Sequence, residues 1–405
     1  MVVTRCEGRW TLEDRFASPW QYLPVEVQPG SCALRAELEY ERAGATLDLG
    51  CVGTAGFRGW SGGVRKSFVI TAEAATPGYV AGELEPGTWQ VMIGLHRVPP
   101  GGVDYRATAT VSSVPGELVP KPDPEEPAPS GERPPRRVLP ASPGRRWLAG
   151  DLHAHTVHSD GALTVPELAR FGAERGLDFL AITDHNTVSH HRELPAAGAA
   201  HGITLIPGQE VTTEAGHAGA LGEMDWVDFR EPPDAWLDAT ERAGGLLSVN
   251  HPIGGHVSWM APMRRRPPLI EIWHWSWLDT RWTTPLGWWM AWHPAAIPVG
   301  GSDWHRPGAD APPGSPTTWV EAESDEPAAV LAAVAAGRTA VAADRDGPVL
   351  LRLGDELLAA GAEGTILAGP GGPKARVTSG LARFPAAGGV HRLLDTTGAV
   401  LALTG

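Results

Sequence analysis

The chain of 405 residues is too long for one ordinary hydrophobic core, so its length predicts two or three domains. A formal net charge of −14 argues against a surface that binds a nucleic-acid duplex, because phosphate backbones are held by an excess of Lys and Arg.

The sequence lacks a signal-peptide pattern and an apolar run of about 18 residues, so we expect no membrane span and a cytoplasmic location. The cysteines, Cys6, Cys32 and Cys51, are odd in number and lack zinc-site spacing, which favours reduced thiols.

Residues 1–114 are predicted to form an N-terminal β-sandwich that serves as an accessory domain. Short apolar or alternating runs are separated by turns rich in Gly and Pro, which is typical of antiparallel sheets. These runs are Ala33–Leu38, Thr46–Val52, Ser67–Thr71, Thr88–Gly94 and Tyr105–Ser112. The pattern is generic, and it fits a structural or lid-forming domain as well as a binding module.

Residues 115–146 are predicted to be a Pro-rich linker. The stretch Pro120–Pro129 has the composition of a semi-rigid, extended chain and cannot form a packed core. The basic run Arg133-Pro-Pro-Arg-Arg137 is expected to be a solvated face of this linker.

From residue 147 to residue 345 the pattern changes to alternating strands and helices, which is typical of an α/β domain. Thr164-Val-Pro-Glu167 is a capping box that predicts a helix ending at Gly176. A second helix is predicted at 233–243, and a third at Pro327–Ala336 with Ser324 or Asp325 as its N-cap. Strands are predicted at 147–149, 178–183, 203–207, 246–250, 269–273, 295–300 and 338–341.

Residues 346–405 are predicted to form a small β-rich C-terminal segment. Alternating apolar residues begin at Val349-Leu-Leu-Arg-Leu353 and recur at 375–378, 390–394 and 399–403. No chemistry is predicted for this segment.

Residues able to bind metal follow the carboxyl ends of the predicted strands. Asp151-Leu-His-Ala-His-Thr-Val-His-Ser-Asp-Gly161 follows the first strand, and alternation along an extended chain places His153 and His155 on one face. The later strand ends carry His185, Glu210, His251, and Asp303 with His305. Because the chemistry of a parallel β/α barrel lies at the carboxyl ends of its strands, we expect these side chains to meet at a metal centre.

Taken together, the motifs resemble those of the polymerase and histidinol phosphatase (PHP) superfamily of metallohydrolases. They are Asp151-x-His-x-His-x-x-x-Ser-Asp-Gly, Ile182-Thr-Asp-His-Asn, Gly208-x-Glu-Val-Thr-Thr, Asn250-His-Pro and Gly301-Ser-Asp-x-His. The stretch Glu210-Val-Thr-Thr-Glu-Ala-Gly-His217 and the upstream β-domain are most similar to the CehA/McbA-type branch. The resemblance covers roughly residues 147–345 and implies a distorted (β/α)7 barrel.

The resemblance also implies two or three divalent metal ions, and His, Asp and Glu ligands without Cys suit Zn, Mn or Fe. By analogy one metal is held by His153, His155, Glu210 and Asp303. A second shares Glu210 and adds His217 and His251, and a third is held by Asp160, His185 and His305. Asp184 and Asn250, each next to a ligand, are expected to orient an imidazole, whereas His158 lies outside the ligand set.

Such a centre predicts a phosphoesterase in which a metal-bridging hydroxide attacks phosphorus. His274 is expected to protonate the leaving oxygen, and Arg306 is placed to meet a phosphate. One alternative is a carboxyl-ester, carbamate or amide hydrolase that uses the same site. A third hypothesis is an inactive PHP-like binding protein, against which the complete ligand set argues.

A run of tryptophans is expected to line the substrate cleft. The eight residues are Trp259, Trp273, Trp275, Trp277, Trp282, Trp288, Trp289 and Trp292. An aromatic wall suits a flat leaving group, so the expected partner is a small-molecule phosphoester, aryl ester or aryl carbamate. The sequence leaves the oligomeric state open.

Overall fold

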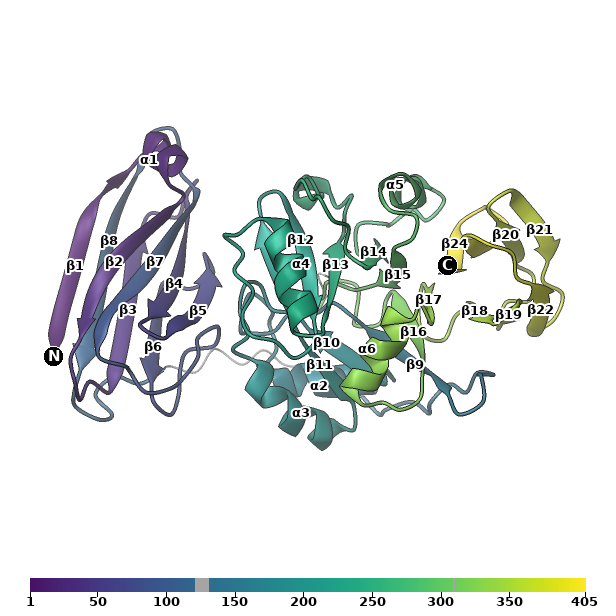
Figure 1. The fold of residues 1–405 in the computed structure, drawn as a ribbon, viewed down its shortest axis with the longest axis horizontal. Coiled ribbons are helices and arrows are strands. Elements are labelled where there is room, and N and C mark those ends of the chain that lie inside the picture. The colour runs from purple at the N-terminus through teal and green to yellow at the C-terminus, as the bar shows by residue number, and fades with distance from the viewer. Residues whose placement is uncertain (121–130, 309) are drawn as a thin grey trace. The chain divides into compact units, whose positions relative to one another are not determined.

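The computed structural model describes residues 1–120, 131–308 and 310–405 (Figure 1). Its contacts divide the chain into two compact units. The first comprises Met1–Glu125 with the short segments Val157–Asp160 and His185–His190, and the second comprises the rest. Within the described ranges, no helix is both long enough and apolar enough to cross a membrane.

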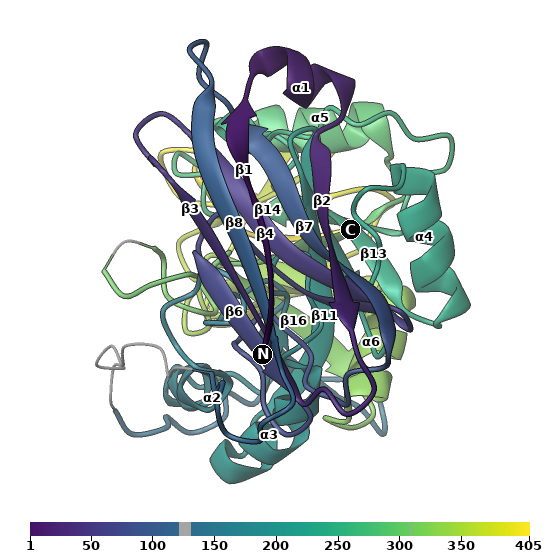
Figure 2. The same cartoon turned by 90° about the vertical axis from the view of Figure 1, so that its left-hand side faces the viewer.

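The first unit contains two antiparallel four-stranded sheets (Figure 2), which confirms the predicted N-terminal β-structure. One sheet has the order β1 (Val2–Trp10), β8 (Val103–Ser112), β3 (Ala33–Tyr40), β6 (Ser67–Thr71). The other has the order β2 (Trp20–Val27), β7 (Gly87–Arg97), β4 (Thr46–Gly53), β5 (Gly56–Gly62). Strands β1, β2 and β5 and the short helix α1 (Leu12–Ala17) were not among the predicted elements.

One apolar core joins the two sheets of this unit. Alternate residues of β2 are buried, namely Leu23, Val25 and Val27, so one face of the strand packs inward. They pack in a single cluster with Leu34 from β3 and Trp89 from β7, which makes the unit a sandwich with an interior of its own.

The second unit is built on one continuous sheet of 13 strands. Its order is β15-β14-β13-β12-β11-β10-β9-β16-β17-β24-β23-β20-β21. The strands that precede the predicted ligands are β9 (Arg146–Asp151), β10 (Phe179–Ile182), β11 (Thr204–Thr213), β13 (Leu246–Asn250), β14 (Leu269–Trp273) and β15 (Ile297–Gly300). Strands β9, β10 and β11 run parallel to one another, as do β13, β14 and β15, so their carboxyl ends lie on one edge of the sheet.

A closed, all-parallel barrel is not what the sheet forms. Strand β12 (Gly216–Leu221) is antiparallel to β11 and β13, because only Glu214 and Ala215 separate it from β11 and a parallel crossover needs a far longer connection. Strand β16 (Thr317–Ala322) is antiparallel to β9 and to β17 (Thr339–Ala342). In the described part of the chain, no ladder joins β15 back to β16 or β17.

The two ends of the ligand-bearing sheet nevertheless meet at a seam. The hydroxyl of Thr318 accepts a hydrogen bond from Gly300 N (2.7 Å) and donates one to Gly300 O (2.8 Å). Beyond β9 and β15, an isolated parallel bridge joins Ala154 to Trp304. These few contacts therefore join the two ends of the sheet, whereas a closed barrel would have a continuous ladder of hydrogen bonds between strands at this place.

Helices cover the outer faces of this sheet. They are α2 (Val165–Glu174), α3 (Leu194–His201), α4 (Pro233–Arg242), α5 (Thr284–Trp292) and α6 (Pro327–Ala335). The predicted capping box is present at α2, where the Thr164 hydroxyl accepts from Glu167 N and Thr164 N donates to the Glu167 carboxylate. At α6 the predicted caps are wrong, because the N-cap is Glu326 and its side chain makes no capping hydrogen bond.

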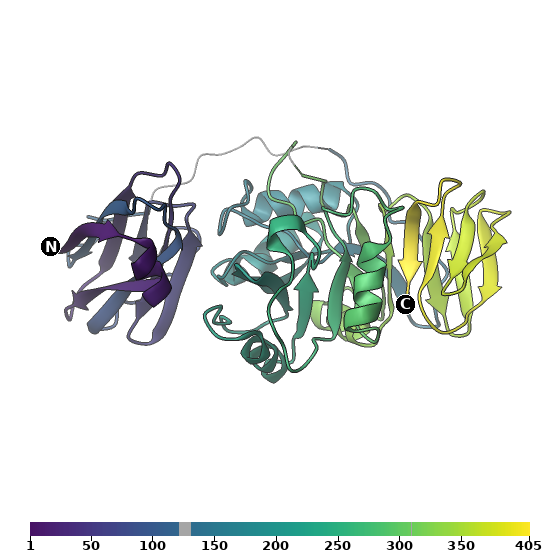
Figure 3. The same ribbon diagram turned by 90° about the horizontal axis from the view of Figure 1, so that it is seen from above.

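The C-terminal segment packs as part of the second unit. Strands β18 (Val349–Leu353), β19 (Glu356–Ala360) and β22 (Leu381–Pro385) form a small sheet. Strands β20 (Ile366–Gly369), β21 (Gly372–Arg376), β23 (His391–Leu394) and β24 (Val400–Thr404) extend the large one (Figure 3). Leu350 and Leu393 share a core with Trp147 of β9 and Trp319 of β16, which ties this segment to the strands beside the seam.

Part of the predicted linker, residues 121–130, lies outside the described residues. The described stretch 131–141 has no helix or strand. Its basic run is not simply solvated: Arg136 Nε donates to Asp178 Oδ1 (2.7 Å), and Arg137 Nη1 donates to Arg345 O (2.8 Å) and Gly347 O (2.6 Å). The two guanidinium groups therefore hold this stretch against other segments of the second unit, because each donates to an acceptor on one of them.

Candidate metal centre

The first and last predicted motifs are held side by side by backbone and carboxylate contacts. Asp303 N donates to His153 O (3.0 Å), and His155 N donates to Trp304 O (2.9 Å). Asp151, fully buried, accepts hydrogen bonds from the backbone N–H groups of His153 (3.1 Å), Ser302 (3.0 Å) and Gly314 (2.8 Å). Burial raises the pKa of Asp151 to about 6, although these hydrogen bonds oppose the shift. Asp151, the first residue of its motif, thus connects three segments that are far apart in sequence.

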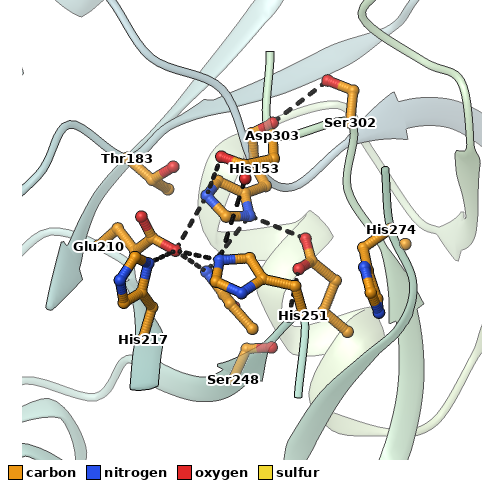
Figure 4. A network of polar contacts seen from close by, with 12 residues as sticks. His153, Thr183, Glu210, His217, Ser248, His251, His274, Ser302 and Asp303 are labelled. Carbon is orange, nitrogen blue, oxygen red and sulfur yellow. Dashed lines mark hydrogen bonds and ion pairs between the residues drawn. The ribbon is translucent and has the colours of Figure 1, made fainter. Parts of the chain in front are cut away.

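Four ligand atoms converge, two from the segment after β9, one from β11 and one from the segment after β15. Figure 4 shows three of the residues, His153, Glu210 and Asp303. His153 Nε2 lies 3.1 Å from each of His155 Nε2, Glu210 Oε1 and Asp303 Oδ1. His155 Nε2 lies 2.9 Å from Asp303 Oδ1 and 3.7 Å from Glu210 Oε2. The structure therefore brings together His153, His155, Glu210 and Asp303, as expected from the strand ends.

Glu210 also faces a second pair of histidines. Its Oε1 lies 3.1 Å from His251 Nε2 and 3.4 Å from His217 Nδ1. The β-register explains the arrangement, since Thr212 is paired with His217 and His217 with Asn250, so Glu210, His217 and Asn250 project from one face. One carboxylate stands between two groups of imidazoles, which is the position of a bridging ligand.

The residues predicted to hold a third metal fall in two places. In the second unit, the His305 ring stacks on His155 with ring centroids 4.2 Å apart, and His305 Nδ1 lies 2.7 Å from Asp303 O. In the first unit, His185 Nε2 lies 3.5 Å from Asp160 Oδ1.

Opposite charges control protonation at the centre. Burial alone would lower the pKa of His153, but the charges of Asp303, Glu210 and Glu271 raise it well above its ordinary value. Burial would raise the pKa of Asp303, yet His153 and His155 hold it well below its ordinary value. The histidines and carboxylates thus compensate one another in a buried space, where unpaired charges are costly.

The backbone at the centre adopts conformations that most residues avoid. His251 has φ of 27° and Asp303 has φ of 54°, in the left-handed region that costs non-glycine residues on the order of 1–3 kcal/mol. Close packing restricts the neighbouring position as well, because a Cβ atom on Gly301 would collide with Glu271 Oε1 and His153 Cβ. Strain of this kind persists where the surrounding contacts fix a functional geometry.

The sequence reasoning missed Glu271, which orients two of the histidine segments. Its Oε1 lies 2.9 Å from His153 Nδ1, and its Oε2 accepts from His251 N (2.8 Å). Because a carboxylate only accepts, Nδ1 of His153 donates its proton to Glu271, and Nε2 is the ring atom that faces Glu210 and Asp303. The available signal was a carboxylate in the middle of the apolar run Leu-Ile-Glu-Ile-Trp273, where burial demands a partner.

Replacing Glu271 with glutamine should weaken metal binding or activity by about 10- to 100-fold, because the neutral amide cannot stabilise the His153 tautomer as a carboxylate does. Competition with a chromophoric chelator measures the affinity. Glu321→Gln is the matched control, since Glu321 is a buried carboxylate on β16 that accepts from Ser142 N (2.6 Å). Equal losses in the two variants would contradict the positioning role of Glu271.

The remaining predicted polar residues have distinct surroundings. Asn250 Nδ2 donates to Glu210 Oε1 (3.1 Å), in agreement with an orienting role. Asp184 accepts from Thr156 N (2.8 Å) and Thr156 Oγ1 (2.6 Å), and so fixes the backbone that follows His155. Asn250 therefore acts on a ligand side chain, and Asp184 on the segment that presents another.

His274 and Arg306 have different surroundings. His274 is buried beside the network (Figure 4), and its Nδ1 lies 2.8 Å from Ser276 Oγ. Burial, and then the charge of His251, lower the pKa of His274 to about 3, so the ring is neutral near pH 7 and holds no imidazolium proton. Arg306 is exposed, and its backbone N–H donates to Asp310 Oδ2 (2.9 Å).

The tryptophan run does not form one wall. Trp273, Trp277 and Trp289 are packed in the core between β14 and α5, whereas Trp275 and Trp282 are exposed. The other three, Trp259, Trp288 and Trp292, line a cavity of about 360 Å³. An aromatic lining is thus present, but it is built from three of the eight residues.

The chemistry of the converging side chains fits metal ions. Ligand atoms bonded to Zn²⁺ at about 2.0–2.2 Å lie roughly 3.3 Å from one another, close to the spacing around His153 Nε2. Only nitrogen and oxygen donors are present, as Zn, Mn and Fe sites use. His251 Nδ1 is buried without a hydrogen-bond partner among the described residues, while its Nε2 faces Glu210. Such a set accommodates more than one ion.

Comparison with known proteins agrees with this geometry. Residues 151–257 match the model of the PHP domain. The resemblance to the PHP superfamily seen in the sequence is therefore supported over residues 151–257. The matched stretch contains His153, Glu210 and His251, whereas Asp303 and the tryptophan cavity lie beyond it.

Two curated relatives are similar to part of this chain. The 3',5'-nucleoside bisphosphate phosphatase of Chromobacterium violaceum is 42% identical over 86 residues, which are 20% of this chain and 29% of that protein. The 5'-3' exoribonuclease of Haemophilus influenzae is 40% identical over 63 residues, 16% of this chain and 23% of that protein. The chain thus spans less than a third of the length of these relatives.

Solved structures are also similar to parts of this chain. A two-domain Bacteroides vulgatus protein described as containing a PHP-like metal-dependent phosphoesterase has a TM-score of 0.43 and 16% identity, covering 68% of this chain and 99% of that one. An amidohydrolase from Chromobacterium violaceum has a TM-score of 0.32 and 19% identity, covering 40% of this chain and 89% of that one.

Proposed function

We propose that the protein is a metal-dependent phosphoesterase that hydrolyses a small-molecule phosphate ester. The observation that carries the proposal is the buried convergence of His153, His155, Glu210 and Asp303, with Glu210 shared by a second histidine pair. Bound divalent ions would supply Lewis-acid charge and activate water, which is the chemistry that in-line displacement at phosphorus requires. No protein nucleophile is then needed.

Each residue set has a task in this proposal. His153, His155, Glu210 and Asp303 would hold the first ion, and His217 and His251 would hold a second one shared with Glu210. Asp160 and His185 would complete a third site with His155 and His305. The third assignment is supported by chain connectivity, because Asp160 follows His155 by five residues and His185 directly follows Asp184.

The residues around the ligands would orient them and the substrate. Glu271 fixes the His153 tautomer, so a lone pair is presented without rearrangement. Arg306 is proposed to meet the phosphate, since an exposed guanidinium beside His305 can donate a pair of hydrogen bonds to an anion. His274, being neutral, is proposed to orient the leaving oxygen through an N–H group rather than to deliver an imidazolium proton.

A second candidate is a carboxyl-ester, carbamate or amide hydrolase that uses the same centre. It is favoured by the hairpin β11–β12, which carries Glu210 and His217 in the sequence resembling the CehA/McbA-type branch, and we propose membership of that branch. The aromatic cavity suits an aryl group in either reaction. An inactive binding protein is a weaker candidate, because every predicted ligand is present in the chain.

The two reactions separate in one assay. Metal-loaded protein is tested against p-nitrophenyl phosphate, bis-p-nitrophenyl phosphate, an aryl ester and an aryl carbamate, with the Asp303→Ala protein as the background for contaminating hydrolases. We expect phosphate release that depends on divalent metal and is absent from the variant. Turnover of the carbonyl substrates alone would overturn the phosphoesterase, and no turnover of any substrate by metal-loaded protein would favour the binding protein.

A further inference from the structure

The tryptophan cavity is a separate feature of the second unit, outside the matched PHP stretch. Its volume is about 360 Å³, at the lower end of the range for small-molecule sites. The residues that line it include Trp259, Met260, Met263, Arg266, Trp288 and Trp292. The lining is therefore aromatic and thioether-rich, with one cationic side chain.

The rings of the cavity are fixed by their own packing. Trp288 and Trp292 stand four residues apart on α5, on one helix face, and their rings stack with centroids 4.8 Å apart and planes 21° from parallel. Trp259 is 8% exposed and meets Trp236 edge to face, at 6.4 Å between centroids. A planar ligand would meet aromatic surfaces already in place, so little side-chain entropy is lost on binding.

Arg266 brings an uncompensated positive charge to this lining. Its guanidinium carbon lies 4.5 Å from the centroid of the Trp292 ring, a cation–π distance. Its neighbour Arg265 is neutralised by Asp238 (2.6 Å) and Glu241 (2.6 Å). Within the described ranges, by contrast, Arg266 makes no ion pair with a carboxylate. Stacking occupies the guanidinium face and leaves its N–H edge available to an anion.

The cavity wall is attached to the segments that carry the second histidine pair. Trp259 N donates to Pro252 O (2.9 Å), directly after His251. Met260 N and Ala261 N both donate to Ala215 O (2.7 and 2.9 Å), two residues before His217. One side of the wall is thus joined by backbone hydrogen bonds to the segments that present His217 and His251.

We propose that this cavity is a subsite for a planar aromatic group that carries an anionic substituent of its own. The ring stacks in the lining of Trp259, Trp288 and Trp292, and the substituent accepts hydrogen bonds from the Arg266 guanidinium. The inference rests on the proposed function and names its substrate class: aromatic phosphate esters with a second anionic group that does not react.

Binding without turnover tests the subsite directly. Naphthalene-2-sulfonate has a ring and an anion but no hydrolysable ester, and calorimetry on metal-loaded protein compares it with methanesulfonate and 2-naphthol. We expect it to bind at least about tenfold more tightly than either, and Arg266→Gln and Trp292→Ala each to weaken it by about tenfold. Arg265→Gln is the matched control and should leave binding unchanged. Equal weakening in both arginine variants, or equal binding of methanesulfonate, would overturn the subsite.

Kinetics separate a failure of the subsite from a failure of the proposed function. A naphthyl phosphate with a ring sulfonate should have a lower KM than plain naphthyl phosphate, and Arg266→Gln should remove that difference. If both esters are hydrolysed with equal KM and the sulfonate does not bind, the phosphoesterase stands and the subsite is overturned. If the sulfonate binds as expected but neither ester is hydrolysed, the subsite stands as a ligand site and the proposed function fails.

Discussion

Replacing Asp303 with alanine should reduce metal-dependent hydrolysis by at least about 10³-fold, equivalent to about 4 kcal/mol of transition-state stabilisation. The carboxylate lies 2.9 Å from His155 Nε2 and 3.1 Å from His153 Nε2, so its removal leaves two imidazoles without the anion that compensates a bound cation. Steady-state kinetics and elemental metal analysis of the same preparation measure the loss.

The control for this variant is Asp279→Ala, which removes an exposed carboxylate that pairs with Arg281. It should keep full activity and metal content. Circular dichroism and thermal unfolding establish that the Asp303 variant is folded. A folded Asp303→Ala protein with full activity would refute the site.

Removing the metal should abolish activity and lower the free energy of unfolding, because His153, Glu210 and Asp303 crowd together in a buried space that a cation stabilises. Ligand linkage sets the size of the effect, about 2.7 kcal/mol when the free ion stands at 100 times its Kd. Calorimetric unfolding of chelator-treated protein, before and after Zn²⁺ or Mn²⁺ is restored, measures it. If chelator treatment changed neither the free energy of unfolding nor the activity, the centre would bind no metal ion.

The pH dependence of stability should differ between the two forms. In metal-free protein the pKa of His153 is raised above its ordinary 6.5, so its contribution to stability is fully present below pH 6.5 and lost as pH rises through the folded value. The pKa of Asp303 is lowered below its ordinary 3.8, so its contribution is present above pH 3.8 and lost as pH falls through the folded value.

A bound ion replaces the proton on His153, so the metal-loaded protein should lack the alkaline decline and lose stability on acidification below about pH 6.5, as protons compete for the imidazoles. Unfolding free energies measured from pH 4 to pH 10 with and without metal test this. Identical profiles for the two forms would contradict the assignment of His153 as a ligand.

Much of the fold could be predicted where local patterns decide it. Strands β13 and β14 have the predicted bounds, because short apolar runs between polar turns specify buried strands. Helix α2 begins at its capping box, which acts locally. Strand β12 and its antiparallel direction were missed, since Gly-His-Ala-Gly-Ala-Leu has little β-propensity and is held by its two neighbours.

The convergence of His153, His155 and Asp303 was predictable because these residues follow strand ends, which a parallel arrangement brings together. Glu271 was not, because it lies inside β14 and reaches His153 only through the pairing of β14 with β13 and β15. The tryptophans were misjudged for a related reason: spacing alone does not say which rings face the core. Packing of α5 on β14 buries Trp289 and leaves Trp288 and Trp292 at the cavity.

The seam has a consequence for how the protein folds. The hydrogen bond from Asp303 N to His153 O joins residues 150 positions apart, a long loop to close. During synthesis His153, His155, Glu210 and His251 emerge from the ribosome well before Asp303. The nascent chain can therefore bring most of these residues together early. The group of His153, His155, Glu210 and Asp303 is completed only when the seam forms. Under the proposed function, capture of an ion and the last long-range closure of the sheet would be one step, which added metal would accelerate.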